Sequence, residues 1–181
     1  MKSVHGLILC GGKSTRMGQD KTSVLLQGKP LLTHSIELFT SLNIDFHLSV
    51  NPNQKDLIEN YPSVIDQFEA IGPLGGILTG LKSLGKDLLI IPVDMPQLTK
   101  NLLLKLVDAF GNHELVRCFQ RNGRIEPFPS LWKSEATSLL NELLDERELS
   151  LQKCITRLPH HLLDSTDSEV FKNLNYPEDL G

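Results

Sequence analysis

The stretch LCGGKSTRMGQDK at positions 9–21 gathers glycines and cations directly after the apolar run VHGLIL. Its Gly-Lys-Ser tripeptide suggests a P-loop, which requires G-x-x-x-x-G-K-[ST] so that backbone N–H groups wrap the phosphates. The pattern fails in both registers. Residue 7 is Leu where the first glycine is required, and a count that starts from Gly6 puts Gly12 where the lysine is required. The stretch is therefore not a P-loop.

What remains is a glycine pair followed by positive charge. Gly11 and Gly12 have no Cβ, so their backbone N–H groups can approach a ligand closely. Lys13, Arg16 and Lys21 follow within ten residues. These cations would neutralise a polyphosphate, and a guanidinium can bind one with two parallel hydrogen bonds. The composition of this stretch also suits a basic surface loop, and both readings stay open here.

Polar residues also stand at the ends of later apolar runs. Asp94 follows the run LLIIPV, Asn51 follows FHLSV, and Asp66 follows SVI. A carboxylate beside a buried strand is costly unless it meets water, a cation or a metal. Mg²⁺ prefers oxygen ligands and is commonly held by one or two carboxylates together with substrate phosphates. Asp94 is thus a candidate metal ligand or the cap of the next turn, while Asn51 is a candidate base or ribose contact or a turn former.

A second glycine-rich segment, GPLGGILTGL, starts at Gly72. Gly75 and Gly76 would leave bare backbone near a helix N-terminus, which suits an anion or a flat ring. Close packing of the helix on the sheet explains Gly80 equally well.

Strand-like and helix-like segments alternate along the chain. Strands are expected over 4–10, 46–50, 63–68, 87–94, 114–119, 127–132 and 160–165. Helices are expected over 30–42, 53–61, 74–84, 99–110, 134–146 and 150–158, with Thr99 and Ser134 as N-caps and a last helical turn after Asn175. Asn122-Gly123 is expected to form a hairpin turn.

This alternation predicts an α/β fold, with a mostly parallel sheet covered by helices and the ligand at the carboxyl edge of its strands. We expect one domain over 1–181, with a nucleotide-binding part over 1–111 and a less regular, acceptor-side part over 112–181. Net charge is −4, which argues against nucleic-acid binding. No run approaches the ~18 apolar residues of a membrane span. The three widely spaced cysteines indicate neither a disulfide framework nor a zinc site, and a cytoplasmic protein is expected.

Residues 9–21 match the pattern L-x-G-G-x-[ST]-x-R-M-G-x-[DN]-K, and GPLGGI, PVDMP, EPFPSLW and FKNLNYPEDL follow in order. With these motifs the chain resembles the MobA family of molybdenum cofactor guanylyltransferases over nearly its whole length. The resemblance implies a Rossmann-like, three-layer nucleotidyltransferase fold. It also implies transfer of GMP from GTP to the terminal phosphate of molybdenum-molybdopterin, with Mg²⁺ and release of pyrophosphate. Proteins that donate molybdopterin or mature molybdoenzymes are implied partners.

The same resemblance implies roles for single residues. Lys21 would contact the phosphates, Arg16 would neutralise their charge, and Asp94 would hold Mg²⁺; these three are the expected catalytic residues. Nucleotide contacts are expected from Leu9, Cys10, Gly11, Gly12, Lys21, Asn51, Asp66 and Asp94. Cys10 stands where the pattern usually has a small alanine, and Asn173 and Asn175 match positions near the acceptor.

Two alternatives stay open at this point. A sister enzyme with CTP or another phosphorylated acceptor would carry the same first motif. A nucleotide-binding module without catalysis would have no need for Arg16, Lys21 and Asp94 together.

Overall fold

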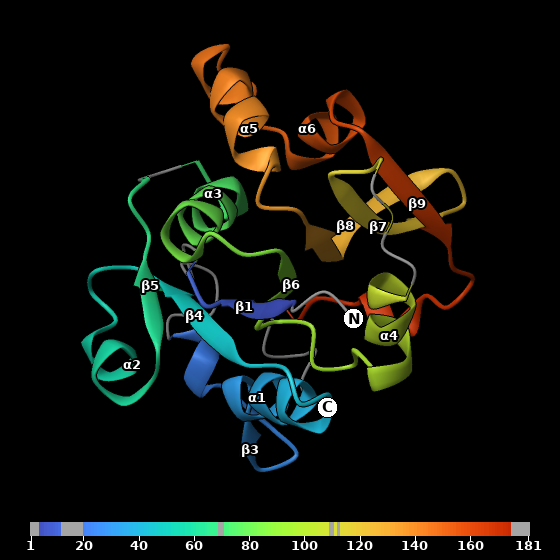
Figure 1. The fold of residues 1–181 in the computed structure, drawn as a ribbon. Helices are drawn as coiled ribbons and strands as arrows, with labels where there is room; N and C mark the ends of the chain where they lie inside the picture. The colour runs from blue at the N-terminus through green and yellow to red at the C-terminus, as the bar shows by residue number, and fades with distance from the viewer. Residues whose placement is uncertain (1–3, 12–19, 69–70, 109–110, 112, 175–181) are drawn as a thin grey trace.

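The computed structural model describes residues 4–11, 20–68, 71–108, 111 and 113–174. Within these residues, seven strands form one sheet in the order β5-β4-β1-β6-β8-β7-β9 (Figure 1). Their bounds along the chain are β1 His5–Leu9, β4 Phe46–Val50, β5 Ser63–Ile65, β6 Leu88–Pro92, β7 Val116–Arg121, β8 Arg124–Trp132 and β9 His160–Asp164. A separate two-stranded hairpin, β2 Leu25–Leu26 and β3 Lys29–Pro30, was not predicted.

The sheet is mostly parallel, as the sequence predicts. β5, β4, β1 and β6 run in the same direction, and β9 is parallel to β7. Only β8 runs against its neighbours β6 and β7. The predicted α/β class is confirmed, and the antiparallel β8 joins the two halves of the chain in one sheet.

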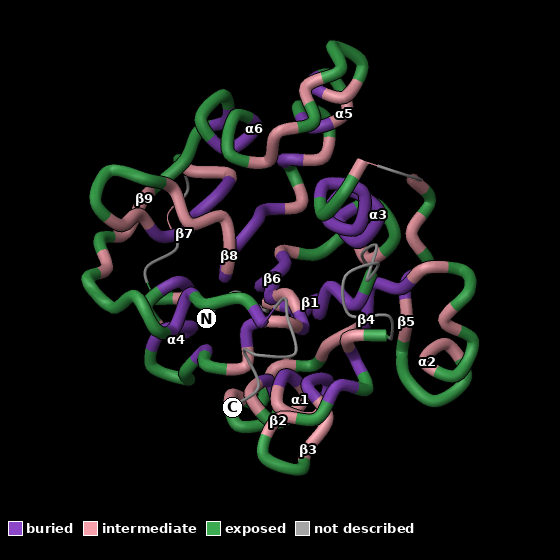
Figure 2. The backbone as a smooth tube through the Cα atoms, turned by 180° about the vertical axis from the view of Figure 1, so that it is seen from behind, coloured by how far each residue is buried: buried purple, intermediate pink, exposed green. Residues whose placement is uncertain are grey.

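Helices cover both faces of the sheet (Figure 1). One buried cluster joins the sheet to α1 Leu31–Ser41 and α4 Lys100–Val107, with α2 Lys55–Asn60 packed beside them. A second cluster on the other face joins it to α3 Pro73–Leu84, α5 Ala136–Asp145 and α6 Leu151–Arg157. Figure 2 shows buried residues concentrated in the central strands and in α3. The fold therefore has three layers.

The helix starts follow the sequence in part. Thr99 caps α4, since its side chain accepts a hydrogen bond from the Leu102 N–H at 3.3 Å. The predicted cap at Ser134 is wrong, because α5 begins after Glu135 with no side-chain cap. The Ser134 N–H instead donates to the Asp87 carboxylate at 3.0 Å, which ties the start of α5 to the segment before β6.

β8 is longer than predicted and irregular. It begins at Arg124, and its register with β7 shifts between Arg117 and Phe119. The turn predicted at Asn122-Gly123 is confirmed by positive φ angles of 52° and 73°, which favour these residue types in two-residue hairpins. The predicted helical turn after Asn175 lies outside the described residues. Within the described part of the chain, no helix has the length and apolar character that a membrane crossing requires.

Candidate nucleotide site

The carboxyl ends of β1 and β6 meet at one edge of the sheet. Leu9 pairs with Pro92 in parallel register. Val93 directly follows β6, and its N–H donates to the Leu9 carbonyl at 3.1 Å. Gly11 and Asp94 therefore leave the sheet side by side, two residues after Leu9 and Pro92. The glycine-lined strand end and the acidic strand end share one rim, as the sequence predicts for Gly11; Gly12 lies outside the described residues.

Lys21 and Asp94 form an ion pair at this rim. Lys21 Nζ lies 2.7 Å from Asp94 Oδ2, although the two residues are 73 positions apart. Both side chains are mostly enclosed, with exposed fractions of 19% and 17%. A carboxylate removed from water needs a cation or a metal. In this structure the lysine of the first motif supplies that charge.

Lys21 begins a short 3-10 helix, η1 Lys21–Ser23, whose N-cap is Asp20. Asp20 Oδ1 accepts hydrogen bonds from the Thr22 N–H at 2.9 Å and from the Thr22 hydroxyl at 2.8 Å. Thr22 is buried. This cap fixes the backbone from which Lys21 reaches Asp94. Asp20 belongs to the first motif, and sequence reasoning gave it no role.

Asn51, a predicted nucleotide contact, directly follows β4, the strand next to β1. The Cys10 N–H donates to the Ser49 carbonyl at 2.9 Å, so β1 and β4 end together. A Cβ added at Gly11 would lie 3.3 Å from Asn51 Oδ1. The Asn51 side-chain amide makes no hydrogen bond to any described residue. It is half-buried beside a bare glycine, an arrangement that leaves it free to bind a ligand.

Gln54, which sequence reasoning missed, connects these strand ends. Its side-chain Nε2 donates to Asp20 Oδ2 at 2.7 Å and to the Cys10 carbonyl at 3.3 Å. Its Oε1 accepts from the Asn51 N–H at 2.9 Å. A glutamine in the segment NPNQ carries no motif that predicts these three partners.

Asp66 follows β5 at the same edge, and one of its oxygens is already used. Oδ1 accepts from the Phe68 N–H at 2.9 Å and from the Thr79 hydroxyl at 3.2 Å. Oδ2 lies beside α3, 3.0 Å from where a Cβ on Gly75 would stand. Oδ2 accepts no hydrogen bond from the described residues, so it is the oxygen available to a ligand.

Close packing explains the glycines of α3. A Cβ on Gly76 would lie 2.5 Å from Ser49 Oγ, and one on Gly80 would lie 2.7 Å from a Leu7 methyl group. Gly75 and Gly76 are buried. Close packing, which the sequence suggested for Gly80, therefore also explains Gly75 and Gly76. The sequence had suggested these two glycines as bare backbone for a ring or an anion.

Leu9 and Cys10 are buried in the apolar core. Burial raises the pKa of the Cys10 thiol above its usual range, with a further contribution from the negative charge of Asp20. The thiol is therefore protonated at neutral pH and unreactive. Any nucleotide contact from these two residues would come from their backbone.

The end of the described chain returns to Asp94. Phe171 packs edge-on against Phe119 with ring centroids 5.5 Å apart. Leu174, also buried, donates its N–H to the Asp94 carbonyl at 2.8 Å. Asn173 is exposed and directly precedes this contact, so the structure brings the FKNL segment beside the proposed site. Asn175 lies outside the described residues.

Two other cations of the described chain, Lys133 and Arg121, have partners outside this group. Arg16 lies outside the described residues. Lys133 is buried and bonds the Gly111 carbonyl, and Arg121 pairs with Glu126 at 2.9 Å. His160 and His161 are exposed on the edge strand β9.

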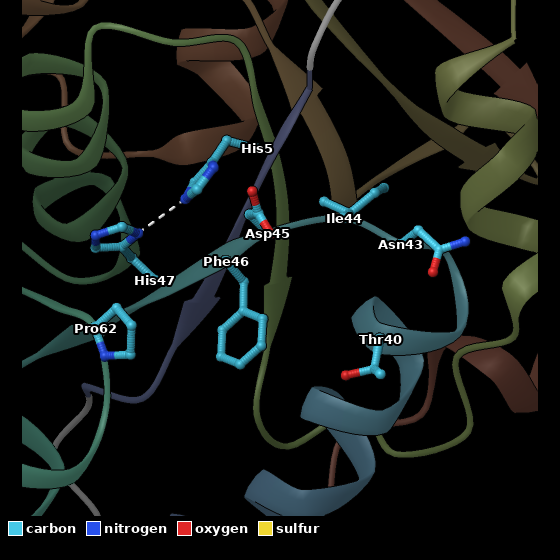
Figure 3. A pocket seen from close by; sticks show the side chains of 8 residues that line it. All are labelled: His5, Thr40, Asn43, Ile44, Asp45, Phe46, His47 and Pro62. Carbon is cyan, nitrogen blue, oxygen red and sulfur yellow. Dashed lines mark hydrogen bonds between the residues drawn. The ribbon is translucent and has the colours of Figure 1, made fainter.

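No cluster of three or more His, Cys, Asp or Glu side chains suited to a metal occurs among the described residues. A cavity of about 630 Å³ also lies elsewhere. Figure 3 shows it at the amino ends of β1 and β4, where the first residues of these strands are His5 and Phe46. It is therefore separate from the Lys21–Asp94 rim.

Comparison with known proteins identifies the family of this chain. Residues 6–162 match the model of the MobA-like NTP transferase domain. A probable molybdenum cofactor guanylyltransferase of Methanocaldococcus jannaschii is 31% identical, over 98% of this chain and 96% of its own. The crystal structure of molybdopterin-guanine dinucleotide biosynthesis protein A from Archaeoglobus fulgidus superposes with a TM-score of 0.82 at 20% identity, covering 98% of this chain and 95% of that one.

Other solved structures resemble this chain in fold alone. The 4-diphosphocytidyl-2C-methyl-D-erythritol synthase of Anaerococcus prevotii gives a TM-score of 0.74 at 13% identity, over 99% of this chain and 93% of that one. The match to the family model, however, spans both halves of the chain, from β1 into β9. The chain therefore belongs to the MobA-like NTP transferase family.

Proposed function

We propose that this protein transfers GMP from GTP to the terminal phosphate of molybdenum-molybdopterin and releases pyrophosphate. The observation that carries the proposal is the Lys21–Asp94 pair, formed where two strands end beside Gly11. The names of the relatives supply the nucleotide and the acceptor. A cation, a carboxylate and bare backbone on one rim are the groups that a metal-bound triphosphate requires.

Each site residue has a proposed part. The backbone of Leu9, Cys10, Gly11 and Gly12 holds the nucleotide, and Lys21 and Arg16 bind its phosphates. Asn51 and Asp66 bind the guanosine part through the side-chain atoms that make no bond to described residues, the Asn51 amide and Asp66 Oδ2. The part of the chain after residue 112 binds the acceptor, and in it Asn173 directly precedes Leu174, whose N–H donates to the Asp94 carbonyl.

Asp94 fits Mg²⁺ as a single protein ligand. Its carboxylate is a hard oxygen donor, and only its Oδ2 is engaged by a described residue, Lys21. Mg²⁺ commonly takes one or two carboxylates and completes its shell with phosphate oxygens and water. When held by Asp94, the ion would supply positive charge that neutralises negative charge developing on the phosphates.

The chain's own residues then act mainly by position and charge. The acceptor phosphate is already an anion, so attack on the α-phosphorus of GTP requires no strong general base. Lys21 stabilises charge on the phosphates, and the strand ends hold the reacting groups in line. Cytoplasmic location and partner proteins that donate molybdopterin or receive the product belong to the same proposal.

A cytidylyltransferase is the second candidate, because the fold likeness includes a diphosphocytidyl synthase. The test measures pyrophosphate release with each of the four ribonucleoside triphosphates, Mg²⁺ and molybdenum-loaded molybdopterin. Release with GTP alone supports the proposal. Release with CTP alone supports the second candidate, and tight GTP binding without release with any nucleotide indicates a non-catalytic module.

A further inference from the structure

We propose that Gln54 is the positioning residue that holds the two flanks of the first motif in register for nucleotide binding. The inference rests on the proposed function, and it concerns a residue that acts through others. Gln54 lies at the convergence of three segments: the end of β1, the turn after β4 and the start of η1. Its amide bonds to all three of them.

Both the amide nitrogen and the amide oxygen of Gln54 form hydrogen bonds. An amide nitrogen has two donors, and Nε2 contacts Cys10 before the motif's glycines and Asp20 just before its last lysine, at 3.3 Å and 2.7 Å. Oε1 receives the Asn51 N–H at 2.9 Å. One planar group thus sets the spacing between both flanks of the motif and the candidate base-binding residue.

These bonds do not serve the helix that Gln54 precedes. Gln54 is the N-cap of α2, but its side chain makes no capping bond there. Glutamine is also not among the residues preferred at that position, which are Ser, Thr, Asp and Asn. The amide is directed away from its own helix, across to the strand ends.

The contact with Asp20 leads to the ion pair. Asp20 divides its carboxylate between two tasks, with Oδ1 capping Thr22 and Oδ2 receiving Gln54. The capped turn carries Lys21, which reaches Asp94. Loss of the Gln54 bond releases Oδ2 and the start of η1, so the lysine loses its fixed approach to the carboxylate and the phosphates.

The test exchanges the two functional groups. Gln54→Glu replaces the amide donor with an acceptor and sets two carboxylates against each other. Asp20→Asn keeps the oxygen that caps Thr22, but its new amide N–H₂ group then faces the amide N–H₂ group of Gln54. The double variant D20N/Q54E restores a single donor–acceptor bond in the opposite direction. Gln27→Glu, the same change at an exposed residue of the β2–β3 turn, is the matched control.

We expect each single variant to bind GTP with Mg²⁺ about 10- to 100-fold more weakly by calorimetry, the range typical of lost outer-shell hydrogen bonds. The double variant recovers the part of the loss that comes from the contact between residues 20 and 54, while the bond to the Cys10 carbonyl stays broken. Gln27→Glu matches the wild type. Affinity of Gln54→Glu also recovers as the pH falls from 8 to 5.5, because close carboxylates share a proton and re-form the bond. A purely structural defect would not show this pH-dependent recovery.

Losses that simply add in the double variant, or single variants that behave like Gln27→Glu, overturn the inference. A wild-type protein that binds GTP but transfers nothing to molybdopterin refutes the proposed function, while the affinity cycle still decides the role of Gln54. A wild type that binds no nucleoside triphosphate overturns both.

Discussion

The two edges of the central sheet differ in what they offer a ligand, although β1 connects them within five residues. At the amino edge, His5 and His47 share a hydrogen bond of 2.8 Å beside the cavity of about 630 Å³. At the carboxyl edge, Lys21 and Asp94 form an ion pair, and Gly11 lies beside the Asn51 side chain. The cavity and the ion pair therefore lie at opposite edges of the sheet.

This contrast reflects how parallel strands deliver residues. Loops that leave the carboxyl ends of adjacent strands start from neighbouring points, so residues far apart in sequence come together. Lys21 and Asp94 meet in this way across 73 positions. The cavity at the amino edge is lined largely by one continuous segment, residues 43–47. The convergence of different chain segments is therefore a better indication of the candidate nucleotide site than the presence of a cavity.

The largest expected effect comes from Asp94→Asn, which removes the charge that pairs with Lys21. We expect transfer to fall about a thousandfold, since a bound metal contributes several kcal/mol and about 1.4 kcal/mol changes a rate tenfold. Rates are measured by pyrophosphate release. Asp45→Asn, at the amino edge, is the matched control and should retain the wild-type rate. Equal rates in Asp94→Asn and wild type would remove Asp94 from the site.

Lys21→Met keeps an unbranched side chain but loses the ammonium group. We expect kcat/KM for GTP to fall about 10- to 100-fold, because hydrogen bonds to charged groups contribute roughly 1.5–3 kcal/mol. Steady-state kinetics check this, with Lys86→Met as the exposed control near the amino edge. Unchanged kcat and KM would contradict a role for Lys21 at the phosphates.

Substitutions of two glycines, one near each edge of the sheet, distinguish an effect on stability from an effect on GTP binding. A Cβ on Gly76 would clash with Ser49 Oγ at 2.5 Å, and one on Gly6 would meet Phe46 Cβ at 2.9 Å. Each Gly→Ala change should lower the free energy of unfolding by about 1–3 kcal/mol, as overpacking does. Denaturant titration measures this. Only Gly76→Ala should also weaken GTP binding; an equal loss in Gly6→Ala would erase the distinction between the edges.

The smallest effect concerns the histidine pair. Burial lowers the pKa of His5 and of His47 below the usual histidine range, and Lys86 lowers both further, while Asp45 partly opposes this at His5. The unfolded chain therefore binds protons first, so this contribution to stability is present above pH about 6.5 and is lost as the pH falls from that value through the lower pKa of the folded state. His47→Gln should flatten the pH dependence of unfolding between pH 7 and 5 without changing GTP affinity. An unaltered pH profile would show that the pair does not control it.

Sequence alone predicted the features that local patterns encode. The strands β1 and β6 lie within the predicted ranges 4–10 and 87–94, and the cap at Thr99 and the turn at Asn122-Gly123 follow from cap and turn chemistry. The meeting of Lys21 and Asp94 is consistent with the predicted parallel order of their strands. Asp94 could be selected because a carboxylate follows an apolar strand, and Lys21 because it is one of the cations that follow the glycine pair.

The remainder depends on tertiary contacts that leave no local pattern. Gln54 has no diagnostic spacing, since its partners come from three segments. Ser134 has the residue type of an N-cap, but its hydroxyl donates to the Glu135 carboxylate, and its N–H donates to Asp87 of another segment. Apolar periodicity also does not encode strand direction, so the reversal at β8 was not foreseen.

A crystal structure with Mg²⁺ and a GTP analogue that cannot be hydrolysed would decide which edge of the sheet binds the nucleotide. We predict a metal ion about 2.0–2.1 Å from a carboxylate oxygen of Asp94, with the triphosphate beside Gly11 and Lys21. A nucleotide bound in the cavity beside His5 and His47, or a metal held away from Asp94, would contradict the site proposed for this protein.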